Sequence, residues 1–251
     1  MDNSVLLEES QLRIDVLGVG VDNLTFEEAA ARAAALTEGE GFSYGVTPNP
    51  EFLLLAKKNE AFRAVLGGAD LVVADGIGVV KAAKILGRPL KAKIPGIELA
   101  QALCASMAGT GKKLFLLGAK PGVARAAGEN LMKKYPGLTV CGVHDGSFQE
   151  DAAVIEEIRA AGADAVFVCL GAPKQELWMA QNGPKTGAKF MLGAGGSLDV
   201  FAGVVERAPE KWQKAGLEWL YRLAREPRRI GRMAKLPLVL VDAAAARIRG
   251  K

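Results

Sequence analysis

Carboxylates that follow apolar strands are the residues of this sequence best suited to acid–base chemistry. Asp75 comes directly after the apolar residues 71–74, so a short strand would deliver its side chain to the edge of a sheet. The same aspartate could instead cap the helix predicted to begin at Ile77, and the residues alone favour neither role. Asp145 and Asp199 also follow predicted strands and are further candidates at that edge, for contacts with a nucleotide.

Two glycines mark turns at which backbone amides could meet phosphate oxygens. Gly118 and Gly171 each stand between an apolar strand and a helix, where the absence of a side chain exposes the first N–H groups of that helix. The alternative is that both are ordinary helix-entry turns. Because ligands of open parallel sheets bind at the carboxyl ends of the strands, the turns at 47–49, 75–76, 118–122 and 171–175 are predicted to share one edge.

Other kinds of site find little support. The single histidine, His144, argues against a His-rich zinc site and a Ser-His-Asp triad, and there is no Asp-x-Asp pair. The glycines at 18–20 and 193–195 lack the third glycine of a dinucleotide fingerprint, and residues 109–113 lack the full P-loop pattern. The three cysteines lie in apolar contexts without CxxC spacing and are predicted to be reduced core residues.

Alternating strands and helices must position these turns. Hydrophobic periodicity predicts strands at residues 14–19, 42–46, 70–74, 113–117, 139–143, 165–170 and 189–192. Helices are predicted at 25–36, 50–57, 77–86, 123–135, 151–161 and 173–181, with Asn49 as N-cap and Pro50 as the first helical residue of the second. Strands that are apolar on both faces belong in a parallel sheet covered by helices. The predicted fold is α/β, a Rossmann-like three-layer domain with a mostly parallel sheet plus a C-terminal helical appendage.

Charge is distributed unevenly along the 251 residues, whose net charge is +4. Residues 206–251 hold 12 Lys and Arg against 5 Asp and Glu, whereas residues 1–205 hold 20 against 23. We therefore predict an α/β catalytic domain at 1–205 and a basic amphipathic helical appendage at 206–251. No segment approaches the roughly 18 to 20 apolar residues of a membrane span, and the N-terminus lacks a signal-peptide pattern, so a cytoplasmic protein is expected.

Several motifs occur in the order found in one enzyme family. They are TPNPE at 47–51, ADG at 74–76, LLGA and PG within 116–122, LGAPKQE at 170–176, the glycine turn through 193–199, and the run from 207 to 227. In these motifs the chain resembles the WecG/TagA/CpsF glycosyltransferase family, from about residue 14 to residue 233. The resemblance implies inverting transfer of an N-acetylmannosamine-type sugar from a UDP-sugar donor to a polyprenyl-diphosphate-linked N-acetylglucosamine acceptor, in cell-envelope polysaccharide synthesis of the wall teichoic acid type. UDP-N-acetylmannosaminuronic acid is the alternative donor.

The resemblance also implies roles for particular residues. Asp75 matches the family's proposed base, and no metal cofactor is required. Lys93 stands where the family usually has an arginine, so it keeps the charge for a phosphate without the bidentate fork. The residues that match positions for the substrate sugar are Thr47, Asn49 and Gln175, and those that match positions for the leaving diphosphate are Arg222, Arg229 and Arg232. A solvated helix face is the alternative role for these arginines.

The appendage implies where the enzyme works. By resemblance it would help to close the site and bind the membrane surface, which places the protein peripherally at the inner face of the cell membrane. Its apolar surface would permit a homo-oligomer, and no nucleic-acid partner is expected. Two rival functions remain on the residues alone: a nucleotide-dependent oxidoreductase on the same fold, and a non-enzymatic lipid-binding or nucleic-acid-binding protein that uses the basic tail.

Overall fold

A six-stranded sheet forms the centre of the molecule. The structure is a computed structural model and describes residues 13–209, 211–212, 220–221 and 236–250. The strand order is β4-β3-β8-β7-β5-β6, and every pairing in this sheet is parallel. The strands are β3 (Ser43–Val46), β4 (Leu71–Val72), β5 (Lys113–Gly118), β6 (Thr139–His144), β7 (Ala165–Cys169) and β8 (Phe190–Gly193). Five of these strands are almost completely buried, whereas the edge strand β6 is half-buried. The burial of the five explains their apolar sequences, since only a sheet covered on both faces buries both sides of a strand.

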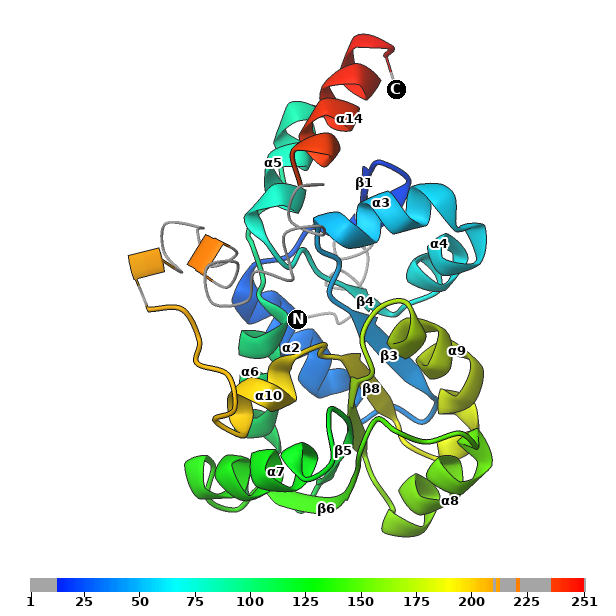
Figure 1. Cartoon of the computed structure of the whole chain (residues 1–251), viewed down its shortest axis with the longest axis vertical. Helices are drawn as coiled ribbons and strands as arrows, with labels where there is room; N and C mark the ends of the chain where they lie inside the picture. Colours follow the sequence, from blue (N-terminus) through cyan, green and yellow to red (C-terminus); the bar gives the residue numbers. More distant parts are fainter. Residues whose placement is uncertain (1–12, 210, 213–219, 222–235, 251) are drawn as a thin grey trace, which may run out of the picture.

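Helices cover both faces of the sheet (Figure 1). One layer contains α2 (Phe26–Leu36), α6 (Gly96–Met107), α7 (Val123–Lys134) and the short α10 (Ser197–Phe201). The other contains α3 (Pro50–Lys58), α4 (Glu60–Gly67), α8 (Asp151–Ala161) and α9 (Lys174–Thr186). Each layer has its own apolar core against the sheet. The prediction of a Rossmann-like three-layer α/β fold is confirmed.

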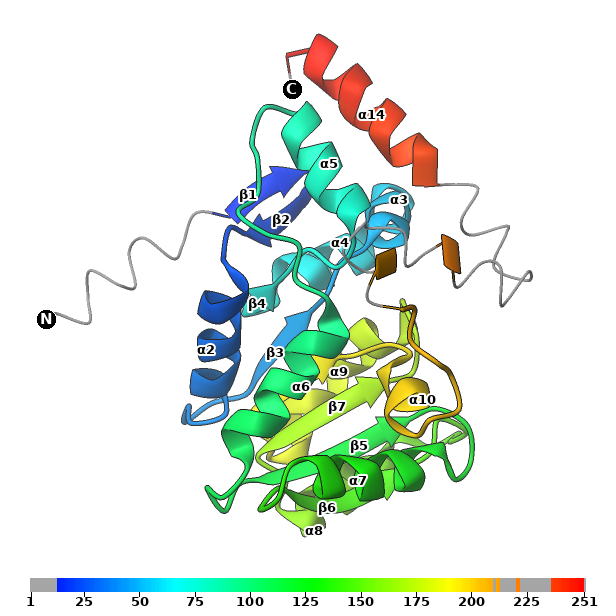
Figure 2. The same ribbon diagram turned by 90° about the vertical axis from the view of Figure 1, so that its left-hand side faces the viewer.

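A second structural unit lies beyond one end of the sheet. It consists of the two-stranded hairpin β1 (Arg13–Val16) and β2 (Val19–Asp22), with helices α5 (Ile77–Ile85) and α14 (Leu236–Ile248). In Figure 2 the last helix, α14, lies alongside α5 although some 150 residues separate them in the chain. Val239 and Ala243 of α14 are fully buried in the same core as Val79 and Ala82 of α5.

Local signals in the sequence account for the starts of two helices. Thr25 forms the capping box that its spacing from Glu28 predicts, with hydrogen bonds running both ways between the two residues. Asn49 caps α3 by accepting hydrogen bonds from the N–H groups of Glu51 and Phe52. Pro50 follows as the first helical residue, as predicted.

The prediction of one strand over residues 14–19 was wrong. The chain reverses there and forms the antiparallel pair of β1 and β2. The turn needs two successive residues with positive φ, and Leu17 (φ 57°) and Gly18 (φ 87°) supply them. Leucine rarely adopts this left-handed conformation, so its type gave no sign of a turn. Burial of the Leu17 side chain against the core offsets the backbone cost.

The predicted C-terminal appendage is only partly covered by the described residues. Helix α14 fits the prediction of a helical tail, whereas residues 213–219 and 222–235 lie outside the described residues. None of the helices in the described ranges is long and apolar enough to cross a membrane. The division at residue 205 stays a prediction.

Candidate functional site

The carboxyl ends of the parallel strands bring the predicted turns to one edge. The turn at 47–49 follows β3, the turn at 75–76 follows β4, and the turns at 118–122 and 171–175 follow β5 and β7. Because all these strands run in the same direction, the prediction that the four turns share an edge is confirmed.

Thr47 is held at the end of β3 between two glycines. Its hydroxyl donates a hydrogen bond to the carbonyl oxygen of Gly193 (3.2 Å), at the end of the neighbouring strand β8. On the other side, a Cβ added to Gly96 would lie 3.0 Å from the same hydroxyl. Thr47 is therefore buried, with only 6% of its surface exposed, and the hydroxyl oxygen retains lone pairs that can accept a hydrogen bond.

Asp75 lies next to this turn and does not cap a helix. Its backbone N–H donates to the carbonyl oxygen of Pro48 (2.8 Å), which joins the loop after β4 to the loop after β3. The N-cap of α5 is Gly76, with φ 111° and no capping side chain, so the helix-cap alternative for Asp75 is wrong. The half-buried Asp75 and the N-cap Asn49 thus lie on adjacent, directly hydrogen-bonded loops.

Lys93 belongs to a third loop at the same place. The N–H of the next residue, Ile94, donates to the carbonyl oxygen of Ala74 (2.9 Å). This loop is therefore hydrogen-bonded to the segment after β4, at the residue that precedes Asp75. The Lys93 side chain is half-buried. Further along, Glu98 in the first turn of α6 forms an ion pair with Arg207, which ties the segment after α10 to the same helix.

Gln175 lies beneath the glycine turn that follows β8. Its side-chain oxygen accepts a hydrogen bond from the N–H of Gly195 (3.2 Å), and its side-chain nitrogen donates to Glu176. Both side chains are buried, at 2% and 0% exposure. Burial raises the pKa of Glu176 to about 7, against the lowering effect of the hydrogen bond from Gln175. Nothing in the sequence marks Glu176 as buried, because an acidic residue in the first turn of a helix normally faces water.

Gly118 is required by close packing. A Cβ at this position would lie 2.3 Å from the carbonyl oxygen of Cys169, and the next residue, Ala119, donates its N–H to that oxygen (3.1 Å). The turns after β5 and β7 are therefore in direct contact. Gly171, by contrast, has open space where a side chain would be.

Asp145 and Asp199 follow different strands of the sheet, β6 and β8. Asp145 follows the edge strand β6, which is four strand spacings, or roughly 19 Å, from β3, so the structure does not bring it to Thr47. Hydrogen bonds from the Ser147 hydroxyl and N–H lower the pKa of Asp145. Asp199 is half-buried in the first turn of α10, beyond the glycine turn at 193–196.

Most helices that begin at this edge have uncapped N-termini. Asn49 caps α3, whereas the N-cap residues of α5, α6, α7 and α9 make no side-chain capping hydrogen bond. The first N–H groups of a helix have no intrahelical acceptor and carry the positive end of the helix dipole. The edge therefore offers several sets of amide donors to an anionic ligand.

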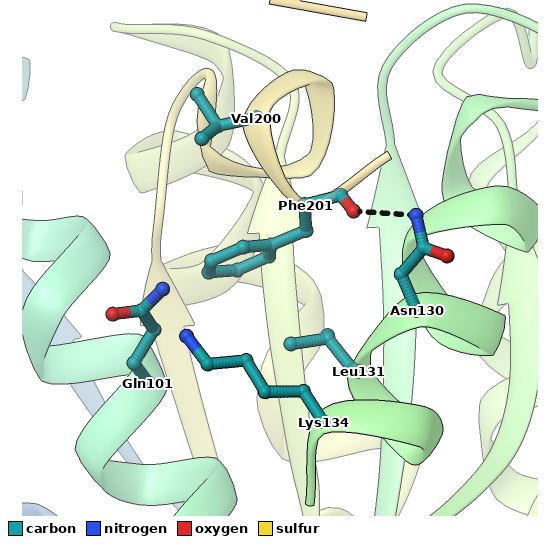
Figure 3. A pocket seen from close by; sticks show the side chains of 6 residues that line it. All are labelled: Gln101, Asn130, Leu131, Lys134, Val200 and Phe201. Atoms are coloured by element: carbon teal, nitrogen blue, oxygen red, sulfur yellow. Dashed lines mark hydrogen bonds between the residues drawn. The ribbon is translucent and has the colours of Figure 1, made fainter. Parts of the chain in front are cut away.

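Two cavities lie away from this edge. One, of about 160 Å³, lies between α6, α7 and α10, where the Asn130 side chain donates to the carbonyl oxygen of Phe201 (3.0 Å) and Gln101 and Lys134 face each other (Figure 3). The other, of about 420 Å³, lies between the β1–β2 hairpin, α3 and α14. None of the edge residues described above lines either one.

The comparison with protein families decides the kind of site. The model of the family described as "Glycosyl transferase WecG/TagA/CpsF family" matches residues 14–251. The chain belongs to this family. The WecG/TagA/CpsF resemblance seen in the motifs is thereby confirmed, and the enzyme is a glycosyltransferase. The oxidoreductase and non-enzymatic alternatives are wrong.

Curated relatives within the WecG/TagA/CpsF family cover almost the whole chain. The N-acetylglucosaminyldiphosphoundecaprenol N-acetyl-beta-D-mannosaminyltransferase of Staphylococcus aureus strain MRSA252 is 37% identical over 238 residues, 94% of this chain and 93% of that protein. The protein of the same name from strain MW2 is 36% identical over the same shares. The predicted arginines of the site, Arg222, Arg229 and Arg232, lie outside the described residues.

Proposed function

We propose that this enzyme transfers N-acetylmannosamine from UDP-N-acetylmannosamine to polyprenyl-diphosphate-linked N-acetylglucosamine, with inversion, in teichoic-acid-type cell-envelope synthesis. The observation that carries the proposal is the similarity to the Staphylococcus aureus enzymes over 94% of the chain, since their name specifies both the sugar and the lipid-linked acceptor. The loops that meet at the ends of β3, β4 and β8 support it, because they gather the residues that such a transfer needs.

Asp75 is the proposed general base. Its carboxylate takes the proton of the acceptor hydroxyl as that oxygen attacks the anomeric carbon of the donor. One C–O bond forms on one face of the sugar while the C–O bond to UDP breaks on the other, so the anomeric configuration inverts and UDP leaves. The hydrogen bond from the Asp75 N–H to the carbonyl oxygen of Pro48 keeps the Asp75 backbone beside the Thr47–Asn49 turn.

Asn49 and Thr47 are proposed to orient the sugar. The helix cap uses the side-chain oxygen of Asn49 and leaves its amide nitrogen as a donor. The Thr47 hydroxyl donates a hydrogen bond to the carbonyl oxygen of Gly193 and can accept one from a sugar hydroxyl. One donor and one acceptor on adjacent residues suit a ring that carries neighbouring hydroxyl and acetamido groups.

The diphosphate is proposed to bind without a metal ion. Support comes from the uncapped helix N-termini at the edge, including those after Gly118 and Gly171, and from the half-buried Lys93. Arg222, Arg229 and Arg232 are proposed to complete this set. Transfer that persists in excess EDTA is expected, and activity restored only by added Mg²⁺ or Mn²⁺ would contradict it.

The enzyme is further proposed to act in the cytoplasm at the inner face of the membrane, through its appendage. Three exposed apolar side chains of α14, Leu238, Val241 and Ile248, recur at spacings of three and seven residues and therefore lie on one face. The opposite face, with Val239 and Ala243, packs on α5. An exposed apolar stripe on a chain with a basic tail suits the surface of an anionic membrane.

A donor screen tests the proposal. The purified chain is incubated with a short-chain lipid-linked N-acetylglucosamine and, in turn, UDP-N-acetylmannosamine, UDP-N-acetylmannosaminuronic acid and UDP-N-acetylglucosamine, and the product mass is measured. We expect a product from the first donor alone, no product from Asp75→Asn, and full activity from Asp15→Asn, which alters an exposed aspartate of strand β1. A product only from another donor would refute the assigned sugar, and full activity of Asp75→Asn would refute the base.

A further inference from the structure

Glu176 carries a buried carboxyl group for which the proposed reaction has no use. It lies in the first turn of α9 with none of its surface exposed. Its Oε2 atom is buried and has no hydrogen-bond partner among the described residues. Burying an incompletely paired carboxyl group costs stability, and an apolar side chain of similar volume would avoid that cost. A function other than packing would explain why glutamate stands here.

Among the described residues, the side chain that donates a hydrogen bond to this carboxyl group is that of Gln175. A glutamine amide can turn its oxygen and nitrogen either way round, so its orientation depends on its neighbours. Here the N–H of Gly195 can only donate, which fixes the amide oxygen on that side (3.2 Å). Glu176 Oε1 accepts from the amide nitrogen and fixes the other side.

The oriented amide supports the turn at residues 193–196. A Cβ added to Gly193 would lie 3.1 Å from the Gln175 side-chain nitrogen and 3.4 Å from Glu176 Oε1, so both groups pack directly under this backbone. The carbonyl oxygen of Gly193 is the acceptor of the Thr47 hydroxyl (3.2 Å). A continuous set of contacts thus runs from Glu176 through Gln175 and the glycine turn to Thr47.

We propose that Glu176 is a positioning residue: by accepting the hydrogen bond from Gln175 it holds that amide and the Gly193–Gly196 turn in the arrangement that binds the sugar nucleotide. This inference rests on the proposed function, because it assigns the turn and Thr47 to the donor site. The ligand class is a nucleoside-diphosphate sugar, the donor of the proposed reaction. The raised pKa of Glu176 agrees with this role, since a neutral carboxyl still accepts a hydrogen bond from Gln175 and adds no negative charge beside an anionic donor.

Three variants test the role of the acceptor oxygen. Glu176→Gln keeps an oxygen at the same reach and is expected to retain donor KM and kcat within about threefold. Glu176→Met keeps the volume without a comparable acceptor and is expected to raise the donor KM about tenfold, with a smaller change in kcat and in acceptor KM. Should Glu176→Met not fold, Glu176→Asp replaces it, because the shorter side chain withdraws the oxygen from Gln175, and the same rise is expected.

A double-mutant comparison separates positioning from simple packing. If Glu176 acts through Gln175, the donor KM of Gln175→Ala should be unchanged by adding Glu176→Met. The inference would be overturned if the two substitutions raised the donor KM by the product of their separate effects. It would also be overturned if Glu176→Gln and Glu176→Met raised the donor KM equally. These outcomes are distinct from failure of the proposed function, which would appear as an absence of transfer by the wild-type chain.

Discussion

A Cβ atom on Gly78 would lie 2.5 Å from the Cγ of Pro50. The first turns of α5 and α3 therefore touch at the point where Asp75 and Asn49 enter the site. The contact couples the distance between these two residues to the packing of two helix N-termini.

Enlarging this contact should disturb catalysis. We expect Gly78→Ala to cost about 1 to 3 kcal/mol of unfolding free energy, because the rigid proline ring must move, and to lower kcat/KM about tenfold. Urea unfolding and steady-state kinetics measure the two effects. The matched control is Gly67→Ala, where an added Cβ meets no atom within 4 Å, and which should keep full activity. Normal activity of Gly78→Ala would show that the contact does not set the site.

Stability should depend on pH through Glu176. Burial raises its pKa from 4.5 to about 7 in the folded chain, so the folded state holds the proton more tightly than the unfolded state. The stabilisation is fully present below pH about 4.5 and is lost as the pH rises through about 7, a span worth about 3 kcal/mol. Urea unfolding between pH 4.5 and 8 should show this loss in the wild type and a flatter profile in Glu176→Gln. If the unfolding free energies of the wild type and Glu176→Gln changed in parallel with pH, the raised pKa of Glu176 would be contradicted.

Membrane binding should depend on the exposed face of α14. Replacing Leu238, Val241 and Ile248 by serine removes three apolar side chains that are 52%, 63% and 86% exposed, and should weaken partition onto anionic vesicles about a hundredfold. Vesicle sedimentation measures this. Val204→Ser, which changes a residue 65% exposed elsewhere on the surface, is the control and should bind normally. If the triple variant bound vesicles as well as the wild type, α14 would not be the membrane contact.

The cysteines should be unreactive in the folded enzyme. Burial raises the pKa of Cys104 and of Cys169 to about 12, and it also raises the pKa of the half-buried Cys141. Because the thiolate is the reactive form, a disulfide reagent at pH 8 should modify at most Cys141 in the native chain and all three thiols in urea. Rapid modification of all three without denaturant would show that the core opens readily.

The sequence predicted those features that depend on neighbouring residues. The caps at Thr25 and Asn49 and the apolar strands are local patterns, and the structure confirms them. The hairpin at Leu17 was missed because its turn is stabilised by packing against distant residues. Helices α4 and α6 were not predicted either.

The candidate site divides in the same way. Strand direction alone brought the turns with Thr47, Asp75 and Gln175 to one edge, and motif resemblance supplied their roles. Glu176 packs against Gly193, which is 17 positions away at the end of strand β8, so no local pattern could indicate its burial. For the same reason the remoteness of Asp145 became visible only once the strand order was known.

The position of β8 has a consequence for how the chain reaches its folded state. This strand lies between β3 and β7, and the N–H of Ser43 pairs with the carbonyl oxygen of Lys189, 146 residues later. Until residue 193 has left the ribosome, the β3–β4 pair and the β5–β6–β7 group have no strand to join them. Contacts of such long sequence separation slow folding. Insertion of β8 between two preformed halves is therefore expected to be the late step that assembles the edge on which catalysis depends.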